Sequence, residues 1–195
     1  CVDPNDIPAV AIVDPELMYS MPKGLTAATG MDALTHAIES FITPGAWAMS
    51  DMFELKAIEM IAANLKAAVD NGNDAAARDA MSQAQYIAGM GFSNVGLGIV
   101  HSMAHPLGAH YDTPHGVANA LLLPYVMEYN AASPAAPKYI RIARAMGVNT
   151  EGMSEVEGVS AAIEAVKNLS LSIGIPQKLH EINVREEDLH QLAID

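Results

Sequence analysis

The chain has 195 residues, of which 51% are hydrophobic, so it can bury one substantial core. Its 23 acidic and 10 basic residues give a formal net charge of −13, which argues against nucleic acid or an anionic membrane as a partner, because both attract basic surfaces. A single cysteine cannot form an internal disulfide, and no segment resembles a signal peptide or a membrane span, so we expect a cytoplasmic protein.

The first predicted element is a short buried strand at residues 10–13. This segment is apolar and β-branched, and it lies between Pro8 and the pair Asp14-Pro15. No later segment is typical of a strand. Because the chain opens on Cys1 rather than on Met, just before this strand, we expect the sequence to be part of a longer protein.

From about Thr26 the apolar residues follow a helical period. We predict helices at residues 26–42, 50–70, 74–92, around 101, from 115 onwards, 137–146, 154–172 and from about 186. Ser50 is the expected N-cap of the second helix, Pro106 and Gly108 are expected to disrupt the fourth, and Pro124 to bend the fifth. The sequence therefore predicts an all-α fold, a bundle of about 7–9 helices with one short N-terminal strand, and a boundary near residue 22.

Four histidines and one aspartate lie in otherwise apolar helical segments. Asp32 and His36 are four residues apart, which places both side chains on one helix face, and His101 and His105 repeat this spacing. Such a pair is often only a hydrogen-bonded contact, but apolar surroundings rarely accept so many imidazoles unless something binds them. The pattern therefore predicts a divalent metal site, and spacing alone leaves open whether His101 or His105 is a ligand.

The fourth expected ligand, His115, could not share an ion with His101 on one straight helix, because fourteen residues span about 21 Å. Pro106, Gly108 and Pro114 are expected to break the helix and let the chain return. A competing motif at residues 89–94 begins like a dinucleotide-binding fingerprint, but no strand precedes it and its last position is Asn. We interpret that segment as helix packing by small residues.

Two long segments resemble the signature motifs of the iron-containing (group III) alcohol dehydrogenases. Residues 30–39, Gly-Met-Asp-Ala-Leu-Thr-His-Ala-Ile-Glu, resemble the first motif, and residues 91–108 with 114–119 resemble the second. The likeness extends over essentially the whole chain. It implies that residues 23–195 form the helical metal-binding domain of the dehydroquinate synthase-like type, and that residues 1–22 are a remnant of a nucleotide-binding α/β domain with the interdomain segment.

The resemblance also implies roles for individual residues. The metal ligands would be Asp32, His36, His101 and His115, and His105 would be the catalytic histidine that relays a proton near the nicotinamide and the substrate.

Other residues would form the pocket around that centre. Phe92 would line a narrow substrate pocket for short diols and aldehydes, and Met21, Leu25 and His115 would contact the cofactor.

The implied activity is reversible hydride transfer between NAD(H) and a small primary alcohol, diol or aldehyde of the lactaldehyde/1,2-propanediol type. Three imidazoles and one carboxylate leave room for a substrate oxygen, and they suit Fe²⁺, Zn²⁺, Ni²⁺ or Co²⁺, of which the family favours Fe²⁺. The family's Gly-Gly-Gly-Ser phosphate loop is absent from these residues. We therefore expect the isolated chain to be inactive without the missing nucleotide-binding domain, and the parent enzyme to be a homodimer.

Two other functions remain open from the residues alone. One is a helical metal-dependent hydrolase, in which the metal would activate water, although no adjacent His-Asp doublet supports it. The other is a non-catalytic helical binding domain with a structural metal.

Overall fold

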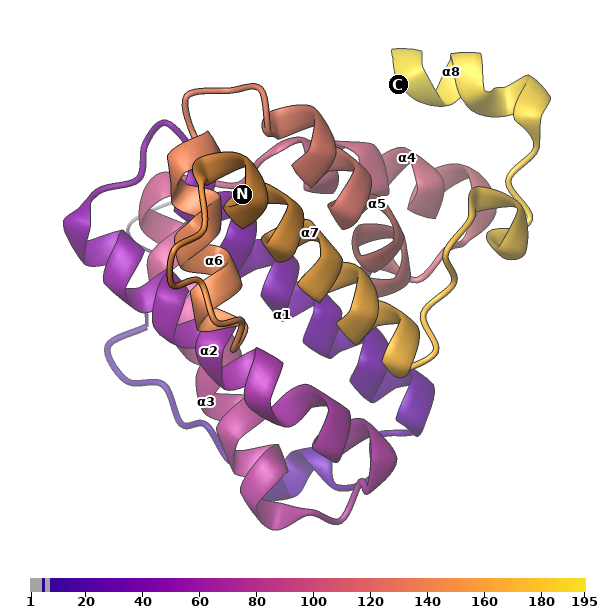
Figure 1. Cartoon of the computed structure of the whole chain (residues 1–195). Helices are drawn as coiled ribbons and strands as arrows, with labels where there is room; N and C mark the ends of the chain where they lie inside the picture. Colours follow the sequence, from indigo (N-terminus) through magenta and orange to yellow (C-terminus); the bar gives the residue numbers. More distant parts are fainter. Residues whose placement is uncertain (1–4, 6–7) are drawn as a thin grey trace.

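The structure, a computed structural model, describes residue 5 and residues 8–195. Within these residues the chain forms eight α-helices and no strand, with short 3-10 helices between some of them (Figure 1). The α-helices are α1 (Lys23–Ile42), α2 (Ala48–Asp70), α3 (Ala75–Val95), α4 (Ile99–Tyr111), α5 (His115–Asn130), α6 (Tyr139–Ala145), α7 (Glu155–Ser172) and α8 (Leu189–Ile194). The 3-10 helices are η2 (Pro15–Met18), η3 (Ala136–Lys138), η4 (Leu179–Ile182) and η5 (Glu186–Asp188). The predicted all-α bundle is confirmed.

The strand expected at residues 10–13 is wrong. This segment has no regular secondary structure, and its apolar side chains are exposed, with Val10 at 76% and Ile12 at 90%. A strand needs a neighbour to pair its backbone N–H and C=O groups, and the described part of the chain offers no other strand. Apolar, β-branched composition alone therefore did not produce the element.

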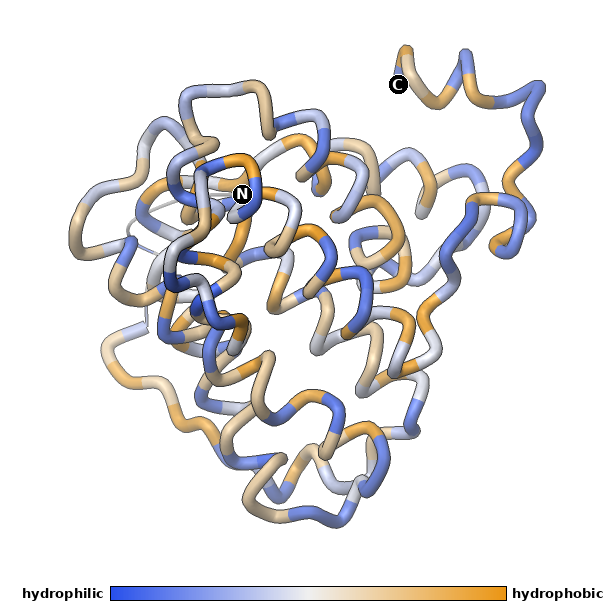
Figure 2. Tube along the Cα trace, in the orientation of Figure 1, coloured by the Kyte–Doolittle hydropathy of each residue, from blue (hydrophilic) through white to orange (hydrophobic). Residues whose placement is uncertain are grey.

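Helix α1 is the centre of the fold, because it packs against α2, α3 and α5 (Figure 1). Most of its residues are buried, including Met31, Leu34, Ile38 and Phe41 at 0% exposure. A methyl group on Gly30 would lie 2.1 Å from a side-chain carbon of Leu65, so glycine allows α1 and α2 to approach closely. The helices show alternating hydrophobic and hydrophilic stretches, as expected where one side of each faces inward (Figure 2).

Two local predictions about helix ends need correction. Helix α2 begins at Ala48 rather than after Ser50, and the Ser50 hydroxyl accepts from the backbone N–H of Trp47 at 3.0 Å, so it caps from inside the first turn. Helix α4 continues through Pro106 to Tyr111. Pro106 removes only one backbone donor, and burial of Pro106 and Leu107 against the core favours the continuous helix over a break.

The chain reverses direction just after α4. Asp112 adopts the left-handed conformation, with φ of 51°, and its N–H bonds to the carbonyl of Gly108. Thr113 and Pro114 follow, and α5 begins at His115. This turn places the start of α5 beside α4, which is the return that the metal-site prediction required.

The last helix, α8, projects away from the bundle near the C-terminal end of α4 (Figure 1). The hydroxyl of Tyr111 donates to Asp188, and His110 pairs with Asp195 at 2.7 Å. Among the described residues, no helix combines the length and the apolar character that crossing a bilayer would require.

Candidate metal centre

Three helices bring the four expected metal ligands together. Asp32 and His36 lie one turn apart on α1, His101 lies in the first turn of α4, and His115 is the first residue of α5. Nε2 of His101 lies 3.1 Å from Nε2 of His36 and 3.7 Å from Oδ1 of Asp32. Nε2 of His115 lies 3.7 Å from the same Oδ1.

These separations fit a single ion. Asp32, His101 and His115 each offer one donor atom, and the three atoms lie within 4.8 Å of one another. Tetrahedral bonds of about 2.1 Å would separate neighbouring donors by about 3.4 Å, so small side-chain rotations suffice. His36 stands at the edge of the set. Its Nδ1 donates to the backbone oxygen of Asp32 at 2.8 Å, which leaves the lone pair of Nε2 directed at His101.

The charges of the site follow from its burial and its partners. Burial lowers the pKa of His101, but the carboxylates of Asp32 and Glu39 outweigh that effect and raise it to about 9. Burial raises the pKa of Asp32, yet its bonds to His101 and Asn119 and the charge of His36 bring it below its usual value. Burial dominates at His36 and lowers its pKa. Without a bound ion, Asp32 is therefore ionised, His36 is neutral and His101 is protonated at neutral pH.

Two buried polar residues support the ligands, and the sequence prediction gave neither of them a role. Glu39 lies on α1, with Oε2 2.6 Å from Nδ1 of His101. Asn119 lies on α5 and donates to Oδ1 of Asp32 at 2.6 Å, with its nitrogen 3.0 Å from Nε2 of His115. Helical spacing could have suggested both, since Glu39 is seven residues after Asp32 and Asn119 is four residues after His115.

His105 lies one turn after His101, and its position differs from that of the converging donors. It is exposed, and its ring stacks on that of His115 with centroids 5.5 Å apart and planes at 22°. His101, in contrast, is buried at the point where the donors meet. The structure therefore places His105 beside the centre, whereas spacing alone could not separate the two histidines.

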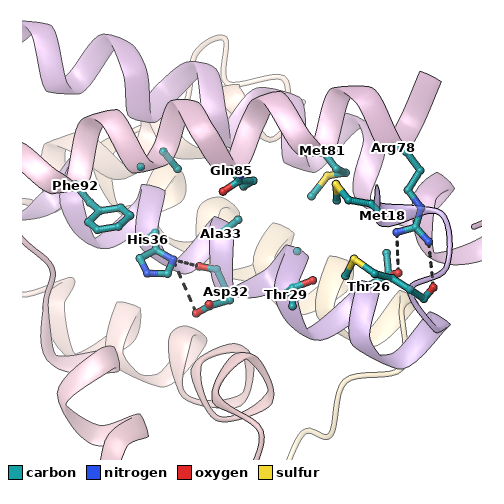
Figure 3. Close-up of a pocket in the computed structure, with 14 residues that line it drawn as sticks. Met18, Thr26, Thr29, Asp32, Ala33, His36, Arg78, Met81, Gln85 and Phe92 are labelled. Atoms are coloured by element: carbon teal, nitrogen blue, oxygen red, sulfur yellow. Dashed lines mark hydrogen bonds and ion pairs between the residues drawn. The ribbon is translucent and has the colours of Figure 1, made fainter. Parts of the chain in front are cut away.

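A pocket of about 450 Å³ extends from Asp32 and His36 along the groove between α1 and α3 (Figure 3). The ring of Phe92 stacks on that of His36, with centroids 4.6 Å apart, so that both rings line the end of the pocket where the expected ligands lie.

At the far end of this pocket, Arg78 donates to the Thr26 hydroxyl at 2.8 Å and to the Met21 carbonyl at 3.2 Å. Met21 therefore lines the pocket, while Leu25 is 49% exposed on the first turn of α1. Cofactor contact by Met21, Leu25 and His115 stays a prediction.

Comparison with known proteins agrees with this geometry. Residues 26–195 match the family model described as "Fe-containing alcohol dehydrogenase family, C-terminal". The chain is 58% identical to lactaldehyde reductase of Escherichia coli K12 over 193 residues, which cover 99% of this chain and 50% of that protein. It is 49% identical to 1,3-propanediol dehydrogenase of Citrobacter freundii over 190 residues, covering 97% and 49%. The chain thus spans about half the length of the curated relatives it matches.

Solved structures have the same fold. A crystal structure of 1,3-propanediol oxidoreductase matches with a TM-score of 0.94 and 48% identity, covering 96% of this chain and 49% of that one. Sulfoacetaldehyde reductase from Bifidobacterium kashiwanohense, solved in complex with NAD⁺, matches with a TM-score of 0.85 and 33% identity, covering 96% and 48%.

Proposed function

The chain belongs to the Fe-containing alcohol dehydrogenase family, and on that premise we propose that it is the metal-binding catalytic domain of an NAD(H)-dependent oxidoreductase. The enzyme would interconvert small aldehydes and the corresponding primary alcohols or diols, of the lactaldehyde/1,2-propanediol type. Relatives of this chain carry the names lactaldehyde reductase and 1,3-propanediol dehydrogenase, which supports that substrate class. A homodimeric parent stays a prediction.

The convergence of four donor side chains at the narrow end of a pocket carries this proposal. Asp32 and His36 both line the pocket; Asp32 belongs to the converging donor set, and Nε2 of His36 lies 3.1 Å from Nε2 of His101 in that set. A small substrate that enters the pocket therefore reaches the donors directly. A purely structural metal would be enclosed by its ligands, whereas His115 keeps 43% of its side chain exposed. The relatives' oxidoreductase names favour this function over a hydrolase.

The proposed reaction, in the direction of reduction, consumes the aldehyde, NADH and one proton and yields the alcohol and NAD⁺. When bound, the metal ion supplies Lewis-acid stabilisation of negative charge on the substrate oxygen. The donor set accepts Fe²⁺, Zn²⁺, Ni²⁺ or Co²⁺, and the family description favours iron.

The protein's own residues supply position and the proton. Phe92, stacked on His36, restricts the pocket to short substrates beside the donors. His105 is exposed and contacts the ring of His115, so it connects bulk water to the reacting centre and can deliver the proton that the substrate oxygen needs.

The proposal is tested with the full-length enzyme, loaded with Fe²⁺ or Zn²⁺ and assayed with NADH and lactaldehyde. We expect NADH oxidation with the wild type, and loss of bound metal and of activity together in His36→Ala. We expect no change in His180→Ala, because His180 is exposed and belongs neither to the donor set nor to the pocket lining. Metal-loaded enzyme that leaves NADH untouched with every short aldehyde tried would contradict the proposal. The 195-residue chain alone should bind metal but not NADH at micromolar concentration, because the family's phosphate-binding loop is absent from its sequence.

A further inference from the structure

We infer that Glu39 is a positioning residue that connects α1 and α4, two of the helices that carry the expected metal ligands. Through one carboxylate it caps the N-terminus of α4 and sets the orientation of the His101 ring. The inference rests on the proposed metal site and adds a residue for which neither the family motif nor the relatives' names provide a role.

The first part of the argument is the cap of α4. Gly98 occupies the N-cap position of this helix and has no side chain that could accept from its first N–H groups. Oε1 of Glu39 accepts from the backbone N–H of Val100 at 2.7 Å. The Glu39 carboxylate, which comes from α1, thus caps α4 in place of an Asp or Ser at the N-cap of α4 itself. Its negative charge lies at the positive end of the helix dipole.

The space around Glu39 is shaped for this contact. The side chain is 3% exposed, and a methyl group on Gly98 would lie 2.6 Å from Oε1. Any other residue at position 98 would therefore displace the carboxylate. The Glu39 carboxylate can therefore occupy this position because Gly98 has no Cβ.

The second part of the argument is the orientation of His101. Oε2 of Glu39 lies 2.6 Å from Nδ1 of His101, and a carboxylate at this distance requires a proton on that nitrogen. Nε2, the other ring nitrogen, is the atom that faces His36 and Asp32. Glu39 therefore holds the His101 ring with Nε2 toward the ion, as carboxylate partners of metal-bound histidines do.

The two contacts have a common consequence. Asp32, His36 and Glu39 lie on α1, while Val100 and His101 lie on α4, so the carboxylate fixes the position of one ligand-bearing helix against the other.

Glu39→Gln in the full-length protein separates this role from simple packing, because glutamine has nearly the same size. If the glutamine oxygen keeps the bond to Val100, its NH₂ group faces Nδ1 of His101 and forces the proton onto Nε2, where it opposes metal binding. We expect Zn²⁺ affinity, measured by competition with a chelator, to fall by about 10- to 100-fold. Circular dichroism should be unchanged. Glu59→Gln is the matched control, since Glu59 is exposed and pairs with Lys56 at 2.9 Å on the surface of α2.

A second measurement does not depend on the variant folding. In the Zn²⁺-loaded wild type with ¹⁵N-labelled histidine, the His101 signal should show a proton on Nδ1 in a strong hydrogen bond. Wild-type Zn²⁺ affinity in Glu39→Gln, or an Nε2–H tautomer of His101 in the wild type, would overturn the inference and leave the proposed function intact. A wild type that binds no Zn²⁺ would remove the proposed metal site and this inference together.

Discussion

The side-chain amide nitrogen of Asn119 donates to Oδ1 of Asp32 across 2.6 Å, and this bond joins α5 to α1 at the candidate metal centre. Asn119 is fully buried, and the same nitrogen lies 3.0 Å from Nε2 of His115. One side chain therefore contacts two expected ligands that come from different helices.

This contact predicts a supporting role for Asn119 in metal binding. Asn119→Ala should lower metal affinity about tenfold or more, because the Asp32 carboxylate loses the donor that orients it. Metal content after dialysis against a weak chelator is the measurement, and Asn168→Ala, on the exposed surface of α7, is the control. Equal metal retention in both variants would show that Asn119 only fills space.

His101 and His105 should differ when each is replaced by glutamine in the full-length enzyme. His101→Gln should lose metal and activity together, because Nε2 of His101 lies among the converging donors. His105→Gln should keep nearly stoichiometric metal, while its turnover falls and its pH profile changes, since the exposed imidazole is the expected proton relay. Metal loss of equal size in the two variants would make His105 a ligand and end this division of roles.

Metal binding should depend strongly on pH. The nearby carboxylates of Asp32 and Glu39 outweigh burial and raise the pKa of metal-free His101 to about 9, so an incoming ion must displace a proton at any lower pH. Zn²⁺ affinity should therefore rise by about tenfold per pH unit from near neutrality up to about pH 9, and then level off. Isothermal titration calorimetry in buffers of different ionisation enthalpy would detect the released proton. Constant affinity over this range would contradict a protonated His101.

Glu54 should destabilise the fold at alkaline pH. Its side chain is 0% exposed, its two carboxyl oxygens have no hydrogen-bond partner among the described residues, and a methyl group on Gly91 would lie 1.9 Å from Oε1. Burial outweighs the opposing effect of the neighbouring Ser40 hydroxyl and, with a smaller contribution from the charge of Asp51, raises the pKa of Glu54 from 4.5 to about 8. The folded protein thus holds a proton that the unfolded chain releases above about pH 4.5.

The stability contributed by this proton is fully present below about pH 4.5 and is lost as the pH rises through about 8. Glu54→Gln should therefore raise the free energy of unfolding at about pH 9 by a few kcal/mol, since each pKa unit corresponds to about 1.4 kcal/mol. It should change little at about pH 4. Urea unfolding of the variant and of Glu59→Gln at both pH values makes the comparison. A pH-independent difference would mean that Glu54 is ionised in the fold.

Gly116 should be sensitive to a single added methyl group. A Cβ there would lie 2.3 Å from the backbone oxygen of Ala28, and backbone yields less easily than a side chain. Gly116→Ala should force α5 away from α1, displace His115, and cost about 1–3 kcal/mol of stability together with metal affinity. Gly24→Ala is the matched control, because a Cβ there would meet no described atom within 4 Å outside its chain neighbours and the adjacent backbone of α1, and alanine favours a helix by about 1 kcal/mol over glycine. Similar stability in the two variants would show that the helices can separate freely.

The sequence by itself determined the helical elements and the placement of Asp32 and His36 on one face of α1. The apolar period of α1 and the four-residue spacing of Asp32 and His36 depend on neighbours within two turns of one helix, so they can be recognised along the chain. The stops after α1 and α2 are equally local, since the residue before Pro44 and the pair Asn71-Gly72 disfavour continuation of a helix.

Tertiary structure decided whatever depended on contacts between distant segments. Residues 10–13 have no partner strand among the described residues, and α4 continues past Pro106 because the buried side chains around it favour a continuous helix. The four-residue spacing did not show which of His101 and His105 is the expected ligand. In the folded chain His101 is buried among the donors, whereas His105 is exposed. The contacts of Glu39 with His101 and of Asn119 with Asp32 join residues 62 and 87 positions apart, a separation at which only the folded packing of α1, α4 and α5 brings them together.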